Sequence, residues 1–135
     1  MPLTDDAFAK IKAGTIRDNQ ITPDDILPFV PNQKIKMYFM SIAIDPKARA
    51  VSQGLFNEAA EKLLNGFCGK LKSYFINQNI VVTEMMATGW TAQGRKLCEQ
   101  LLMKPTSKDE FGHPIYYLDI LTSHLDRLHI TSLVL

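Results

Sequence analysis

Residues 34–54, KIKMYFMSIAIDPKARAVSQG, decide the fold of this chain. Residues 34–45 are rich in aromatic and β-branched side chains and become almost wholly apolar toward Asp45. That pattern is typical of a strand that is buried on both faces inside a sheet. Pro46 should end the strand, because proline donates no hydrogen bond to a β-ladder. A turn over Arg49–Gly54 then leads into a helix.

The rest of the chain alternates between helices and strands. Residues 50–77 carry an apolar residue at every fourth position from Leu55 to Phe75, which predicts a long amphipathic helix. Further segments follow: a strand at 80–87, a helix at 89–102, and strand-like runs near 103–107 and 114–120. A strand, a helix and a second strand normally form a parallel unit. Ligands of such sheets bind beyond the carboxyl ends of the strands.

The first 33 residues predict helices and loops. Thr4 can cap a helix over 4–13 that exits at Gly14, and Thr22 with Pro23 starts a second short helix that ends near Pro28. The predicted fold class is therefore α/β (α+β), a central mixed sheet flanked by helices with its N-terminal strands missing. Because an unpaired sheet edge is rarely left open, we expect a homodimer in which a second copy covers that edge.

Composition excludes several classes of protein. A chain of 135 residues, 46% hydrophobic and 21% charged, suits one domain over 1–135. A net charge of +1 provides no broad field for nucleic acid or an anionic membrane. Cys68 and Cys98 have no metal or disulfide spacing, and we expect no metal site. The start lacks a signal peptide and no run approaches ~18 apolar residues, so we expect a cytoplasmic protein.

The turn at Arg49–Gly54 carries the chemistry. The first turn of a helix has unpaired N–H groups and a partial positive charge, both of which suit a phosphate. The small residues Ala50, Ser52 and Gly54 let the backbone approach a ligand, and the Arg49 guanidinium can bind a phosphate through two N–H groups. The same hexapeptide also fits a plain helix start that binds nothing.

At this point the sequence resembles the GNAT superfamily of acyl-CoA-dependent N-acyltransferases. Their hallmark is Arg/Gln-x-x-Gly-x-Gly/Ala after a strand that ends in a hydrophobic-x-Pro pattern. The run from Ile44 to Gly54 fits that frame, with Ser52 in place of the first glycine. Residues 91–103, TAQGRKLCEQLLM, follow the second family motif in register. The resemblance covers about residues 34–120.

The resemblance implies acetyl-CoA (coenzyme A) as the cofactor. In the family, the backbone of the strand before the turn pairs with the pantetheine arm, and N–H groups of the turn hold the pyrophosphate. The implied cofactor-binding residues here are Ser41, Ile42, Ala43, Ile44, Arg49, Val51, Ser52, Gln53, Gly54 and Thr91.

Acyl transfer also needs a base for the amine and a proton donor for the leaving thiolate. Glu84, the carboxylate inside a predicted strand, is the candidate base, although it also suits a solvent-facing edge position. Cys98 stands where family members often have the donor tyrosine, and a small apolar core role fits it equally well. Tyr38, Tyr116 and Tyr117 are further candidate donors. The three histidines, His113, His124 and His129, show no ligand spacing and read as surface or capping residues.

The sequence thus favours an N-acetyltransferase that moves an acetyl group from acetyl-CoA to an unidentified small-molecule or protein amine. The alternative is a non-catalytic acyl-CoA-binding or regulatory module of the same fold, which Cys98 and the short N-terminal part favour. A small α/β interaction module without a cofactor is a third possibility. The short N-terminal part also leaves open that the chain is a truncated domain.

Overall fold

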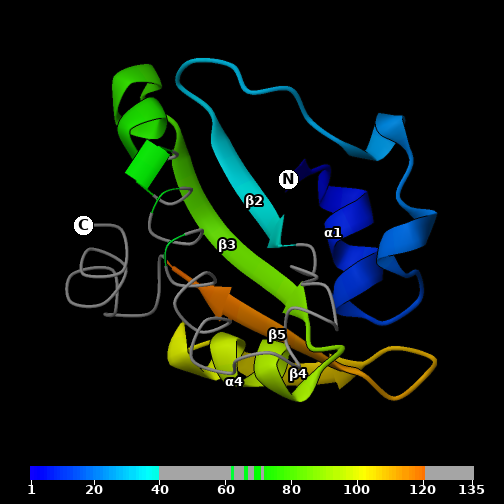
Figure 1. Ribbon diagram of the computed structural model, residues 1–135. Coiled ribbons are helices and arrows are strands. Elements are labelled where there is room, and N and C mark those ends of the chain that lie inside the picture. The colour runs from blue at the N-terminus through cyan, green and yellow to red at the C-terminus, as the bar shows by residue number, and fades with distance from the viewer. Residues whose placement is uncertain (40–61, 63–65, 67–68, 71, 121–135) are drawn as a thin grey trace.

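The computed structural model describes residues 1–39, 62, 66, 69–70 and 72–120 (Figure 1). Its described strands form one open sheet in the order β1-β2-β3-β5-β4. They are β1 (Pro2–Leu3), β2 (Lys34–Phe39), β3 (Val81–Thr88), β4 (Lys104–Lys108) and β5 (Pro114–Asp119). Helices accompany this sheet, so the prediction of a mixed α/β chain is confirmed.

The expected parallel pair is present at the centre of the sheet. β2 and β3 run in the same direction with Lys34 opposite Val81 and Phe39 opposite Ala87. The register shifts after Ile35, and Thr83 is the extra residue, whose hydroxyl donates to the Ile35 carbonyl at 3.3 Å. β5 then pairs antiparallel with β3, and β4 pairs antiparallel with β5.

Capping residues set the ends of the first helix, α1 (Asp5–Lys12). The Thr4 hydroxyl accepts a hydrogen bond from the N–H of Ala7, as the sequence predicts for an N-cap. At the other end Gly14 has a φ of 76°, and the N–H of Thr15 donates to the Lys10 carbonyl at 2.9 Å. This is a Schellman motif, which requires a left-handed residue at the position of Gly14.

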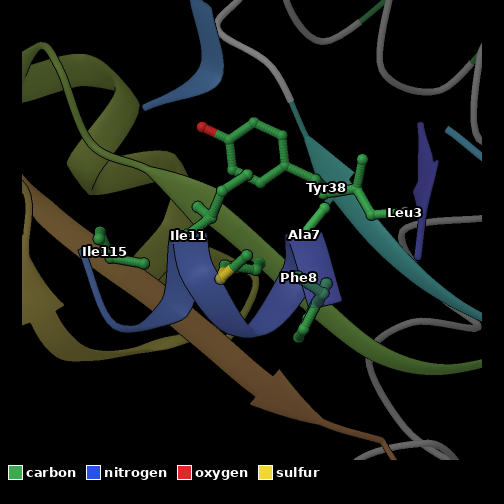
Figure 2. Packing of buried hydrophobic residues seen from close by; sticks show 7 residues of the cluster. Leu3, Ala7, Phe8, Ile11, Tyr38 and Ile115 are labelled. Carbon is green, nitrogen blue, oxygen red and sulfur yellow. The ribbon is translucent and has the colours of Figure 1, made fainter. Parts of the chain in front are cut away.

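The helices cover both faces of the sheet. On one face α1 packs its apolar side chains against the sheet, and Figure 2 shows this cluster: Leu3, Ala7, Phe8, Ile11, Tyr38, Met86 and Ile115. On the other face α4 (Ala92–Gln100) buries Cys98 against Ala87, Tyr116 and Leu118. Residues 72–78 are helical and bring Phe75 to Ile35 and Met37 on that same face. Side chains alternate along each strand, so these sets lie on opposite sides.

The N-terminal part differs from the prediction. Pro2–Leu3 forms β1, which pairs antiparallel with β2 opposite Lys36 and Met37. The edge expected to be open is therefore occupied over this stretch, while the homodimer itself stays a prediction. The second expected helix is only a 3-10 turn over Pro23–Asp25. It does not continue into an α-helix, because Ile26 already has extended backbone angles.

Within the part of the chain that the structure describes, no helix combines the length and apolar character needed to cross a bilayer. The same residues contain no group of three or more His, Cys, Asp or Glu side chains arranged to hold a metal ion.

Candidate functional site

Several strand ends meet at one end of the sheet. We call this end the carboxyl edge, and it is distinct from the outer strands β1 and β4. Both parallel strands end there, β2 at Phe39 and β3 at Thr88. β5 runs the opposite way and begins there, since Ile115 pairs with Thr88. The predicted residues Ser41, Ile42, Ala43, Ile44, Arg49, Val51, Ser52, Gln53 and Gly54 lie outside the described residues.

Thr91 lies at this edge as the N-cap of α4. Its hydroxyl oxygen accepts the N–H of Gly94 at 3.0 Å, and its carbonyl accepts the N–H of Arg95 at 2.9 Å. A hydroxyl has one donor and two acceptor positions, so the Thr91 O–H remains able to donate to a ligand oxygen. The positive end of the α4 dipole points the same way.

Tyr38 reaches toward the carboxyl edge from inside the core. Its ring is 1% exposed and packs under α1 (Figure 2), while its hydroxyl lies 3.0 Å from the Thr88 hydroxyl. Burial raises the pKa of Tyr38 to about 12. The phenol therefore stays protonated across the neutral range, as a proton donor must, but its contact is with a neighbouring side chain rather than with solvent.

Cys98 belongs to α4 and faces the core. The residue is 6% exposed and contacts apolar neighbours that include Ala87 and Met103. Burial raises the pKa of the Cys98 thiol to about 11. Cys98 could be a proton donor or a small apolar residue of the core, and its surroundings favour the core role.

Glu84 belongs to a charged cluster on the α1 face, the Glu84 cluster, formed by Asp5, Lys36, Glu84 and Tyr117. Lys36 Nζ lies 3.1 Å from Glu84 Oε2 and 3.1 Å from Asp5 Oδ1. The Tyr117 hydroxyl donates to Glu84 Oε1 at 2.6 Å, a length typical of a bond to an ionised acceptor. Lys12 Nζ lies over the Tyr117 ring, 3.5 Å from its centre.

These contacts change the ionisation of the cluster. Hydrogen bonds to Asp5 and then Glu84 raise the pKa of Lys36. Burial, followed by the hydrogen bond to Glu84, raises the pKa of Tyr117. A hollow of about 330 Å³ opens beside the cluster, lined by Leu3, Asp5, Leu27, Lys34, Lys36, Thr83, Glu84 and Asp119. Both oxygens of Glu84 are thus engaged by the protein, on an interior strand and not on an edge.

We predict that Glu84→Gln lowers the free energy of unfolding by about 1–2 kcal/mol, because a neutral amide weakens a half-buried, charge-assisted bond and an ion pair. Urea denaturation followed by circular dichroism measures this change. Asp6→Asn is the control: it removes a carboxylate 2.6 Å from Lys10, but that pair is exposed, so the urea midpoint should stay near wild type. Equal midpoints for both variants would contradict a stabilising Glu84 cluster.

The structure brings some of the predicted site residues together and separates others. Tyr38 and Thr91 both approach the carboxyl edge. Glu84 lies four residues before Thr88 on β3, about 13 Å back along the strand at a rise of roughly 3.3 Å per residue. Cys98 lies on the opposite face of the sheet from Glu84. The candidate base and donor therefore do not share one pocket.

The sequence did not predict one group at the carboxyl edge, formed by Asp109, His113 and Trp90. His113 Nδ1 lies 3.0 Å from the Asp109 carboxylate, and the imidazole ring stacks on Trp90 with centroids 4.6 Å apart. The available signal was an Asp four residues before a His across a turn that contains Gly112. Such an Asp organises a turn through its own backbone.

Comparison with known proteins adds no identification. Models of protein families, curated proteins and solved structures were each compared with the chain, and none matches it.

Proposed function

We propose that this chain binds acetyl-CoA at the carboxyl edge and transfers the acetyl group to an amine, as a GNAT-like N-acetyltransferase. The observation that carries the proposal is the parallel pairing of β2 with β3, with Phe39 opposite Ala87. β2 ends at this edge, and the Arg49–Gly54 turn follows it in the sequence, at the start of the helix predicted over residues 50–77. Phosphates bind at such helix starts.

The described residues supply two further supports. The Thr91 hydroxyl can still donate a hydrogen bond at the start of α4. α4 follows β3 directly, so the second family motif, residues 91–103, begins at the edge where the cofactor would lie. The pantetheine arm would pair with the backbone of Ser41–Ile44.

Calorimetry with acetyl-CoA tests the binding part of the proposal. We expect saturable heat with one site per chain, and no heat at millimolar acetyl-CoA would refute it. Incubation with acetyl-CoA and a panel of amines then tests transfer, since each acetylation releases one free thiol that a thiol reagent detects.

We predict that Arg49→Ala weakens acetyl-CoA binding about tenfold or more while the fold stays intact, because it removes a charge-assisted contact to phosphate. Titration calorimetry gives the affinity and circular dichroism the fold. Lys47→Ala removes the same charge two residues away and should bind as wild type does. If Arg49→Ala matches Lys47→Ala, Arg49 is not a phosphate ligand.

The second candidate is a non-catalytic acyl-CoA-binding module of the same fold. The environment of Cys98 favours it, because this thiol is packed among apolar side chains on the face opposite Glu84. Such a module would bind acetyl-CoA with the same dependence on Arg49 but release no thiol with any amine.

A further inference from the structure

A buried carboxylate holds an imidazole ring in the turn between β4 and β5. The Asp109 side chain is 3% exposed, and its Oδ2 lies 3.0 Å from His113 Nδ1. Its Oδ1 accepts the N–H groups of Phe111 at 2.9 Å and His113 at 2.8 Å. Backbone donors thus fix the carboxylate, and the carboxylate in turn fixes the ring.

The partner of Nδ1 determines which ring nitrogen carries the hydrogen. Burial alone would raise the pKa of Asp109, but the bonds from His113 and Phe111 outweigh burial and lower it. An ionised carboxylate only accepts hydrogen bonds, so His113 Nδ1 must carry the hydrogen. In the neutral ring, Nε2 then holds the lone pair and can take a proton.

Aromatic neighbours fix the plane of the ring without covering it. The Trp90 ring is stacked on the imidazole at 18° between planes, and the Phe111 ring meets it edge-on with centroids 6.3 Å apart. The His113 side chain remains 25% exposed, and Trp90 is 39% exposed. A ligand at this surface can therefore reach the imidazole.

Arg17 is a cation with recorded contacts to this turn. Its guanidinium carbon lies 4.7 Å from the centre of the Phe111 ring, and its Nε lies 2.6 Å from Glu110 Oε1. The charge of Arg17 is thus paired with Glu110. The recorded polar contacts of the His113 side chain among the described residues are those with Asp109.

The position of the ring matters most. His113 directly precedes β5, and the Pro114 carbonyl accepts the N–H of Gly89 at 2.9 Å just beyond the end of β3. Trp90 follows Gly89 and directly precedes Thr91, the N-cap of α4. The imidazole therefore lies at the carboxyl edge, where the proposed cofactor would bind.

We propose that His113 is the proton acceptor for the acceptor amine, with Asp109 as the residue that positions its imidazole. This rests on the proposed acetyl transfer. His113 Nε2 takes one proton from the ammonium group, and the neutral amine attacks the thioester carbonyl carbon. The C–N bond forms, the C–S bond breaks, and the second proton lost by nitrogen goes to the leaving sulfur, giving an amide and free CoA thiol. The imidazolium then returns its proton to water.

His113→Ala tests this role. We expect kcat for thiol release to fall about 100-fold or more, the usual range for loss of a general base, while acetyl-CoA affinity by calorimetry stays at the wild-type value. Added imidazole should restore part of the rate, which a merely structural histidine would not permit. His124→Gln is the histidine control and should keep full activity.

Asp109→Asn tests the positioning role. The amide N–H₂ can face Nδ1 as a donor and favour the other tautomer, so kcat should fall at least tenfold with KM for acetyl-CoA unchanged. Added imidazole should not rescue this variant, because His113 still fills the site.

The outcomes separate the two proposals. Full activity in His113→Ala would overturn the role of His113 and leave acetyl transfer standing. A wild-type chain that binds acetyl-CoA but transfers to no amine would overturn it as well, in favour of the binding module. Failure of the wild-type chain to bind acetyl-CoA would overturn the proposed function itself.

Discussion

Replacing Gly14 by alanine is expected to lower the free energy of unfolding by about 3–4 kcal/mol, the combined cost of left-handed backbone strain and a steric clash. Gly14 has a φ of 76° at the end of α1, and a Cβ there would lie 2.3 Å from the Lys108 carbonyl oxygen. That oxygen belongs to the backbone of β4, so it cannot turn aside as a side chain would. Urea denaturation measures the loss.

Gly112→Ala is the matched control. Gly112 has a φ of 81°, but a Cβ there meets nothing within 4 Å. This variant should therefore lose only the conformational part, about 1–2 kcal/mol. The difference between the two variants isolates the contact between the end of α1 and the end of β4. Equal losses would mean that the chain accommodates a methyl group at Gly14 without strain from Lys108.

Replacing Asp109 by alanine is expected to lower the free energy of unfolding by about 2–3 kcal/mol, because it removes a buried acceptor of three hydrogen bonds. The turn between β4 and β5 should loosen, and the stacking of His113 on Trp90 should weaken. Tryptophan fluorescence reports on this stack directly, since the chain has 1 Trp. Asp18→Ala is the control, because its carboxylate accepts only from its neighbour Asn19 among the recorded bonds.

The effect of Asp109 also depends on pH, with a definite sign. Its folded-state pKa is lowered from 3.8, so its contribution to stability is fully present above the unfolded-state pKa. That contribution is lost as the pH falls through the folded-state pKa. The difference in stability between wild type and Asp109→Ala should therefore narrow below about pH 4. A difference that widens below about pH 4 would contradict the lowered pKa.

The main strands and helices could be predicted because their signals are local. Thr4, Gly14 and Thr91 mark helix ends through their own hydrogen bonds and backbone angles, and the sequence predicts each of these ends within a few residues. The strands at Lys34–Phe39 and Val81–Thr88 contain many apolar, aromatic and β-branched residues, which are enriched in strands.

Elements without a local signal could not be predicted. β1 has only two residues, Pro2 and Leu3, which is too short for any periodic pattern. It exists because β2 offers it a ladder and because Leu3, 1% exposed, joins the core under α1. Thr22 and Pro23 do begin a turn, but the chain leaves it at Ile26 to bridge back to Leu3.

The contacts of the candidate site were even harder to predict from local sequence signals than β1 was. Lys36 and Tyr117 meet Glu84 only because β3 lies between β2 and β5 and because a bulge at Thr83 sets the register. Strand order and bulges are properties of the assembled sheet, and no single segment encodes them. The pairing of Asp109 with His113 is local, by contrast, because the two residues are four positions apart in one turn.

The outer strand β4 also bears on how the protein behaves in concentrated solution. Lys104 and Lys108 lie at its two ends, Pro105 lacks a donor, and its register shifts between Pro105 and Ser107. Charge, proline and a bulge each discourage a foreign strand from adding to an edge. At the opposite edge Leu27 already donates to the Pro2 carbonyl at 3.0 Å. Neither outer strand of the described sheet is thus a ready template for fibril growth.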